Sequence, residues 1–269
     1  MQRLGLDVPE PATPGWQRRG QHSAEIRKKI VAAYLSVCSE LRTDPWYASA
    51  DMVIQLADGC VRDFLWQMDE LWEEVGADVR RFVDRRISDE RQDRALKRAS
   101  EQKMARIAGL VLTEPRRAER LVDGLASLTA ELQRPRKEFA EAGAAHLRSP
   151  EPGYWVLPDI EGRNTPFSER DQDDLPGIYR LVRDAAEAGY LRMESRSHVR
   201  WRFRVHTSLA PHYGFSYRGA QYEVKLGAND LLEFCEAARE PQRKRVVAAL
   251  YQRLRGGDVS LLAGDADDD

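Results

Sequence analysis

The chain has 269 residues, of which 42% are hydrophobic and 32% are charged, and its formal net charge is -2. This length allows one large or two ordinary domains, and the composition is typical of a soluble, helix-rich protein. The near-neutral charge excludes binding to nucleic acid through bulk charge alone, so any such contact has to lie in a local patch. No apolar stretch approaches the roughly 18 residues of a membrane span, and the N-terminus lacks a signal-peptide core. We therefore expect a cytoplasmic protein without a membrane partner.

The first part of the chain predicts a flexible start and then a helical bundle. Residues 1–22 are rich in Pro and Gly, which predicts a flexible segment. Three helical patterns follow, with an interruption at Asp58-Gly59 and a predicted helix end at Gly76. These patterns assign residues 23–77 to one helical bundle.

An arginine begins the third of these helices. Arg62 stands where the positive end of the helix dipole disfavours a cation. One interpretation is an ordinary surface ion pair with Asp58 or Asp63. The other is that Arg62 holds a phosphate group supplied by another molecule.

Residues 78–113 change the character of the chain. Apolar residues become sparse, and opposite charges recur at helical spacing, as in Asp93 with Lys97. This pattern predicts a charged, solvent-facing helical linker between two domains. Its arginines also have the chemistry to contact phosphate, namely Arg80, Arg81, Arg85 and Arg86.

Residues 114–226 predict a second unit, in which helices give way to strands. Helical patterns cover 115–133, 137–147 and 175–189, and short strands are predicted near 154–157 and 221–226. After Gly189 the period switches from 3.6 to 2, since Trp201, Phe203 and Val205 alternate with basic residues. A helix, a tight glycine and a hairpin form the order of a winged helix-turn-helix. Residues 227–262 then predict C-terminal helices, and 263–269 a disordered acidic tail.

Motifs for catalysis are missing from the sequence. There is no phosphate-binding P-loop, no His/Cys/Asp/Glu set at metal-ligand spacing and no nucleophile elbow. We therefore expect a chain that is not an enzyme, with no metal site, no catalytic residue and no cofactor of its own.

Two stretches resemble the C-terminal half of bacterial AAA+ ATPases of the origin-recognition/Cdc6-like group. The stretch LADGCVRDFLWQMDELW resembles the helical lid of these ATPases, and Gly59-Cys60-Val61-Arg62 matches their Gly-x-x-Arg signature. The helix and hairpin over 175–206 resemble the winged helix that follows the lid. The resemblance implies that Arg62 senses the γ-phosphate of ATP (sensor 2). The nucleotide-binding domain that precedes such a lid is not in this sequence, so ATP is implied only if a partner ATPase chain supplies it.

These observations predict a mainly α fold, with a helical AAA+ lid-like bundle followed by a winged helix-turn-helix with a small β-hairpin. The predicted function is a non-catalytic DNA-binding module that contacts the DNA backbone. The alternative is a protein-interaction or regulatory subunit that completes a partner's ATP site through Arg62. Acidic neighbours such as Asp184 weigh against DNA contact, and both hypotheses stay open. The residues expected to bind DNA are Arg180 and Arg183 on the helix and Arg196, Arg200, Arg202 and Arg204 on the hairpin.

Overall fold

The computed structural model describes residues 34–35, 37–38, 41–84, 86–133, 151–158, 177–195, 200–217 and 221–256. The predicted flexible start, the short helix at 137–147, the hairpin tip and the acidic tail lie outside these ranges. The described helices are α2 (Ala50–Ala57), α3 (Val61–Glu74), α4 (Val79–Asp84), α5 (Asp89–Arg106), η1 (Ile107–Gly109), α6 (Pro115–Gln133), α8 (Gly177–Glu187), η4 (Thr207–Leu209), α9 (Ala210–Tyr213), α10 (Ala228–Glu236) and α11 (Glu240–Gly256). The strands are β1 (Glu151–Pro158), β2 (Leu191–Ser195), β3 (Arg200–Val205) and β4 (Gln221–Lys225). The expectation of a mainly helical protein with a small β region is confirmed.

The four strands form one sheet in the order β2-β3-β1-β4. β2 and β3 are antiparallel, which confirms the predicted hairpin, and β1 pairs antiparallel with β3 on its other side. β4 adds to β1 in parallel. Trp155 of β1 lies opposite Phe203 of β3, and both side chains are fully buried. The period of two in the sequence therefore does mark a half-buried antiparallel pair.

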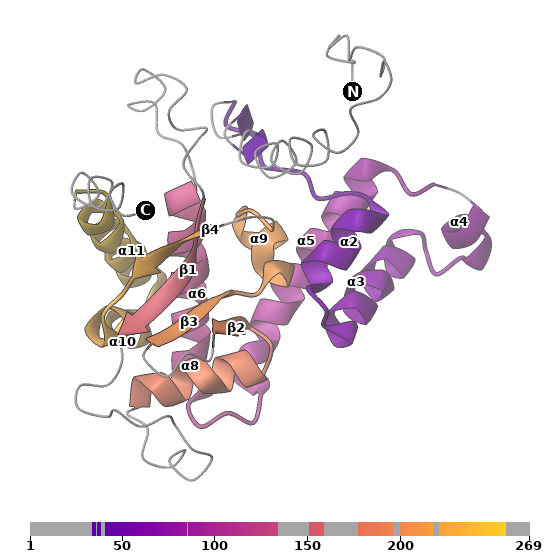
Figure 1. Ribbon diagram of the computed structural model, residues 1–269. Coiled ribbons are helices and arrows are strands. Elements are labelled where there is room, and N and C mark those ends of the chain that lie inside the picture. The colour runs from indigo at the N-terminus through magenta and orange to yellow at the C-terminus, as the bar shows by residue number, and fades with distance from the viewer. Residues whose placement is uncertain are drawn as a thin grey trace, which may run out of the picture.

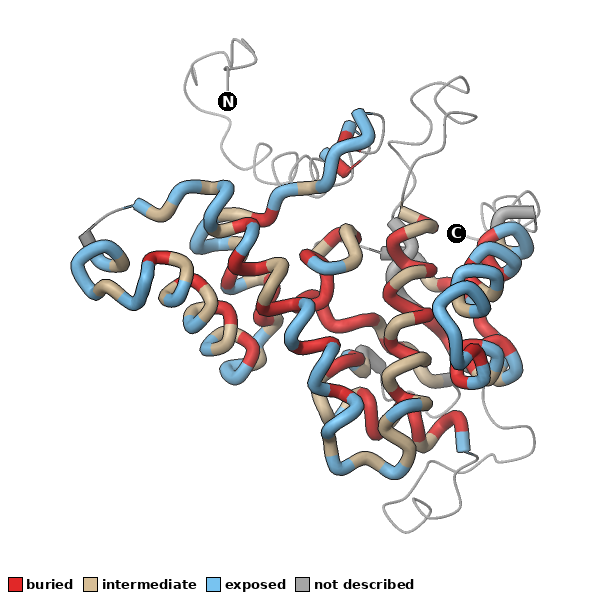
Figure 2. The backbone as a smooth tube through the Cα atoms, turned by 180° about the vertical axis from the view of Figure 1, so that it is seen from behind, coloured by how far each residue is buried: buried red, intermediate tan, exposed pale blue. Residues whose placement is uncertain are grey.

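The helix α6 is the centre of the core. Its apolar residues at helical spacing are buried, and it contacts α8, α10, α11 and the sheet. Figure 1 shows α6 behind the strands, with α10 and α11 beside it. One continuous cluster of buried side chains extends from Tyr47 near the start of the described chain to Tyr251 in α11. The tube in Figure 2 shows this buried centre, with exposed backbone concentrated on α11, around α4 and on the outer faces of α2 and α3.

The helix α5 differs from the expected solvent-facing linker. It is helical, and the predicted pair of Asp93 with Lys97 forms at 2.9 Å, but one face is buried against α3 and α9. This face consists mainly of small and apolar residues: Ala95, Leu96, Ala99, Ser100, Lys103 and Met104. Charged residues beside this buried face also pair with α3, as in Arg98 with Glu70 and Glu74. The many charged residues of α5 therefore made its narrow buried face difficult to predict from the sequence.

α2, α3 and α4 lie at one end of the molecule, and α8, α10 and α11 lie toward the other (Figure 1). α5 joins the two regions, since it contacts α3 on one side and η4 and α9 on the other. Among the described helices, none has the length and apolar character that crossing a bilayer requires.

Candidate functional site

The site builds up from the first turn of α3, where Arg62 lies. The Arg62 Nη2 donates a hydrogen bond of 2.7 Å to the carbonyl oxygen of Ala188, and its guanidinium carbon lies 5.2 Å from the centroid of the Trp66 ring. Ala188 follows the last residue of α8, where carbonyls lack a helical partner and the dipole is negative. Neither Asp58 nor Asp63 pairs with Arg62 in the described structure. The ion pair suggested by the sequence is therefore replaced by a contact with the end of another helix.

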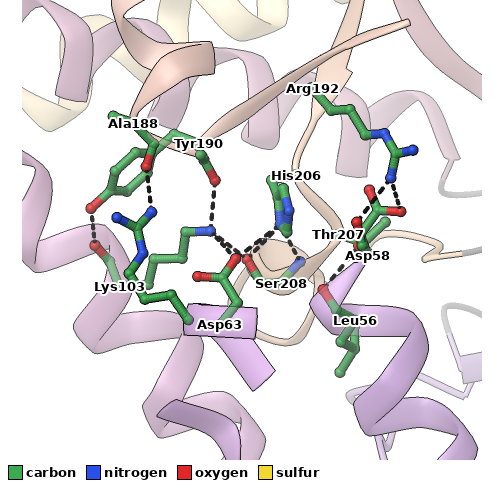
Figure 3. A network of polar contacts seen from close by, with 12 residues as sticks. Leu56, Asp58, Asp63, Lys103, Ala188, Tyr190, Arg192, His206, Thr207 and Ser208 are labelled. Atoms are coloured by element: carbon green, nitrogen blue, oxygen red, sulfur yellow. Dashed lines mark hydrogen bonds and ion pairs between the residues drawn. The ribbon is translucent and has the colours of Figure 1, made fainter. Parts of the chain in front are cut away.

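The next residue of α3, Asp63, belongs to a buried polar network. The Lys103 Nζ donates to the Asp63 Oδ2 at 2.5 Å, to the Gly189 carbonyl at 2.7 Å and to the Ser208 Oγ at 2.8 Å (Figure 3). The side chains of Lys103 and Asp63 are 2% and 1% exposed. Tyr190 Oη in turn donates to the backbone carbonyl of Lys103 at 2.8 Å. An ammonium group has three donors and no acceptor, so these three oxygens match its protonated form.

Burial and the Asp63 carboxylate act on Lys103 in opposite directions. Burial lowers the pKa of Lys103 below its ordinary value of 10.5, and Asp63 partly offsets that effect. The three hydrogen bonds use all three N–H donors of the Lys103 ammonium group. Through this one nitrogen atom, α5 is linked to α3, to the residues after α8 and to η4. The Asp63 Oδ1 has no hydrogen-bond partner within the described residues.

His206 continues the network as a neutral base. Its Nδ1 lies 2.8 Å from the Ser208 Oγ and accepts from the Ser208 backbone N–H at 3.2 Å. Burial first, and then the nearby positive charge of Lys103 and other cations, hold the pKa of His206 well below 6.5. A neutral Nδ1 that accepts hydrogen bonds cannot also donate to Asp63, so their 3.3 Å approach is not an ion pair near neutral pH. The Ser208 hydroxyl therefore accepts from Lys103 and donates to His206.

We expect the neutral state of His206 to make the protein less stable in mild acid. Between the lowered pKa of folded His206 and about 6.5, the unfolded chain binds a proton that the folded chain does not. The free energy of unfolding should therefore fall as the pH falls from 7 to 5, by up to about 1.4 kcal/mol per pH unit from this residue. Urea unfolding at a series of pH values measures the slope.

The matched control is His206→Asn, which keeps an acceptor near the Nδ1 position and does not titrate. Its stability should vary less with pH over the same range than that of the wild type. Equal slopes for the two proteins would show that His206 is not buried in its neutral form.

The hairpin arginines join the sheet to α2. The Arg204 Nη2 lies 2.7 Å from the Asp58 Oδ2, and the Arg204 side chain is only 14% exposed. Arg192, which the sequence analysis did not select, pairs with the same carboxylate and donates to the Asp58 backbone carbonyl at 3.0 Å. The Thr207 hydroxyl donates to the Leu56 carbonyl at 3.0 Å, next to the end of α2 (Figure 3). The basic face of the hairpin therefore packs partly against the helical bundle.

The other arginines expected to contact DNA have different surroundings. The Arg202 Nη1 lies 3.3 Å from a Glu223 carboxylate oxygen of β4. Arg183 lies 3.6 Å from Asp184 and 3.7 Å from Glu187 on its own helix. Arg180 is half-buried on α8. Arg196 and the side chain of Arg200 lie outside the described residues.

The sequence analysis missed the residues at the centre of this site. Lys103 stands in a mixed-charge helix and has no local sign of burial. Its only signal is its spacing, because it lies seven residues after Leu96 and four after Ala99 on the stripe that becomes buried. Asp58 and Asp63 flank Arg62 and were considered only as its possible partners. Their actual partners come from 40 to 146 residues further along the chain.

The whole site therefore joins α3 and the end of α2 to α5, to the residues after α8 and to the β2–β3 hairpin. No curated protein and no solved structure matches the chain. A family model described as ORC-CDC6-like matches residues 12–226, which is most of the 269 residues. The chain therefore belongs to the ORC-CDC6-like family.

Proposed function

We propose that this chain is a non-catalytic DNA-binding protein in which α8 and the β2–β3 hairpin form a winged helix on the DNA backbone. The observation that carries this proposal is the arrangement of α8, which ends at Glu187 and is followed within four residues by the first strand of the hairpin. The strand β1 precedes α8 in the chain and pairs with β3, and the chain order β1-α8-β2-β3 with the sheet order β2-β3-β1 supports a winged helix-turn-helix. In that motif the second helix approaches a groove, and basic side chains around it contact phosphate.

The six arginines have unequal access to phosphate in this proposal. Arg204 would have to leave Asp58, and Arg202 would have to leave Glu223, before either could bind DNA. Arg183 has to compete with two carboxylates on its own helix. We therefore assign Arg204 mainly to positioning of the hairpin. We expect Arg180, which is half-buried on α8, and Arg196 and Arg200, whose side chains lie outside the described residues, to contact phosphate as well.

The triple variant Arg180→Ala, Arg196→Ala and Arg200→Ala should bind duplex DNA about 10- to 100-fold more weakly than the wild type. Each lost phosphate contact should also reduce the slope of log affinity against log salt by about 1. Fluorescence anisotropy with a labelled duplex at about 50 and 200 mM salt, where the electrostatic contribution differs strongly, measures both effects.

The control variant removes the same number of charges from another exposed surface. Arg239, Lys244 and Arg245 lie on or beside α11, and all three are exposed. Their replacement by Ala should leave DNA affinity within about twofold, because these charges do not lie on the helix or the hairpin proposed to contact DNA and salt screens their longer-range effect. Equal losses in the two triple variants, or no binding by the wild type at low salt, would overturn the proposal.

A second function is favoured by the surface around Arg62. Three exposed apolar side chains lie on α2 and α3: Ile54 at 60%, Val61 at 71% and Leu65 at 58% exposed. Val61 and Leu65 are one turn apart, next to Arg62, and grouped exposed apolar residues often mark protein contacts. A partner ATPase docking there would bring its ATP γ-phosphate to Arg62, in place of the Ala188 carbonyl. Because apolar contacts resist salt, partner binding that persists at high salt without DNA binding would favour this function.

A further inference from the structure

A small cavity lies between the end of α3, α4 and the start of α5, far from α8. Its volume is about 320 Å³, and its described lining consists of Val75, Arg81, Arg86, Ile87, Ser88 and Arg91. Every charged group in this lining is an arginine, and it includes no carboxylate. Figure 1 places α4 at the opposite end of the molecule from α8, so this cavity is separate from the proposed winged-helix surface.

The three arginines converge because the chain reverses direction between α4 and α5. Arg81 lies on α4, Arg86 lies in the connection and Arg91 lies in the first turns of α5. Their sequence spacing of five does not place them on one helical face, so this grouping is a product of the tertiary structure. The cavity is therefore not an ordinary solvated helix surface.

The existing partners of these arginines are few and exposed. Arg81 lies 3.5 Å from Asp78, and Arg86 lies 3.1 Å from Asp89, with the two arginine side chains 59% and 84% exposed. Ion pairs of this kind contribute little and exchange readily with other anions. Arg91 is exposed and makes no hydrogen bond or ion pair within the described part of the chain. Two of the three arginines each pair with one carboxylate, Arg81 with Asp78 and Arg86 with Asp89. The group of three arginines and two carboxylates therefore keeps an excess of positive charge.

The start of α5 adds one uncharged polar residue, Ser88, to the lining of the same cavity. Ser88 is the N-cap of this 18-residue helix, and its side chain makes no capping hydrogen bond. The first N–H groups of a helix lack intrahelical partners, and the dipole there favours an anion. Asp89 and Glu90 oppose this effect, although Asp89 already pairs with Arg86 and Glu90 lies 3.5 Å from Arg94.

We propose that this cavity binds a phosphate-bearing ligand about the size of one nucleotide. Arginine forks and a serine hydroxyl match phosphate oxygens, and guanidinium groups hold them with two parallel hydrogen bonds. Val75 and Ile87 supply an apolar wall for a ribose or deoxyribose. The volume lies at the lower end of small-ligand sites, which excludes a larger ligand held entirely inside. The phosphate belongs either to a free nucleotide or to the backbone of a DNA strand.

The test uses the full chain and two probes, inorganic pyrophosphate and a labelled DNA duplex. The pocket variant is Arg86→Gln with Arg91→Gln, which keeps a polar side chain at each position and removes two exposed charges. The control variant is Lys244→Gln with Arg245→Gln on α11, with the same change in net charge. Calorimetry at low salt measures pyrophosphate affinity, and anisotropy measures DNA affinity. Thermal melting confirms that both variants remain folded, as expected for exposed positions.

Pyrophosphate should bind the wild type and the control equally and should bind the pocket variant at least about tenfold more weakly. A parallel loss of DNA affinity in the pocket variant would identify the DNA backbone as the source of the phosphate. Unchanged DNA affinity would identify a free nucleotide. No pyrophosphate binding by the wild type, or equal binding by the pocket variant, would overturn the proposal. The variant with Arg180, Arg196 and Arg200 replaced by Ala should keep its pyrophosphate affinity. Pyrophosphate binding therefore tests the cavity separately from the winged-helix proposal, which is tested by the effect of this triple variant on DNA affinity.

Discussion

Replacement of Lys103 by Met should lower the free energy of unfolding by about 3–5 kcal/mol, which is the usual cost of removing one partner from a buried ion pair. The variant leaves the Asp63 carboxylate 1% exposed and without its cation. It also removes the donor that holds the Gly189 carbonyl and the Ser208 hydroxyl. Urea unfolding followed by circular dichroism at neutral pH measures the loss.

A control variant and a compensating double variant test the same ion pair. Lys97→Met breaks an ion pair with Asp93 whose lysine is 31% exposed, and should cost less than about 1 kcal/mol. The double variant Lys103→Met with Asp63→Asn should recover part of the loss, because no uncompensated charge then remains buried. A loss for Lys103→Met no larger than that for Lys97→Met would mean that water reaches the network.

Two successive residues of α3, Arg62 and Asp63, are both linked to the chain just after α8. Arg62 binds the Ala188 carbonyl and Asp63 binds the lysine that holds the Gly189 carbonyl, so both contact the two residues that directly follow α8. α8 is the helix that we propose lies on DNA. Any ligand that takes Arg62 away from Ala188 would therefore act directly on the position of that helix. The hydrogen bond from Arg62 to the Ala188 carbonyl therefore links the proposed DNA site to the proposed partner site.

Local patterns in the sequence predicted most of the elements that surround the site. The alternation of Trp201, Phe203 and Val205 with basic residues predicted β3, because a half-buried strand has a period of two. The spacing of Leu121, Leu125 and Leu128 predicted the buried face of α6. Both patterns arise from a single element and its nearest neighbour, so they are visible without the tertiary structure.

The partners of the polar residues were not predictable in the same way. The alternation placed Arg204 on a polar face but did not show that Asp58, 146 residues earlier in the chain, lies against that face. Lys103 lies in the segment predicted to face solvent, because apolar residues are sparse there and opposite charges recur at helical spacing. Its pairing with Asp63 depends on how α5 packs against α3. Sequence reasoning therefore found the elements and missed the contacts between them.

Substitutions at the contact between α6 and α10 should also lower the free energy of unfolding by several kcal/mol, about 3–5 kcal/mol for the largest. Phe234 of α10 is fully buried and lies directly over Gly124 of α6. A Cβ atom added at Gly124 would lie 2.5 Å from the Phe234 Cγ and 2.9 Å from its Cε1, far inside the contact distance of two carbon atoms. Phe234→Ala should therefore cost about 3–5 kcal/mol through the cavity that it leaves. Gly124→Ala should cost about 1–3 kcal/mol through overpacking, which exceeds the helix-propensity gain of about 1 kcal/mol.

The effect of Gly124→Ala should reverse its sign when the ring is gone. In the Phe234→Ala background the new methyl group meets empty space, so the helix-propensity gain of about 1 kcal/mol remains and the double variant should be more stable than Phe234→Ala alone. Gly109→Ala is the control, since an added Cβ there has no neighbour within 4 Å, and its effect should be the same in both backgrounds. Urea unfolding of the four proteins of the cycle measures the coupling. A Gly124→Ala effect with the same sign in both backgrounds would show that α10 does not pack on α6 through this ring, and that the C-terminal helices are held on the core by other contacts.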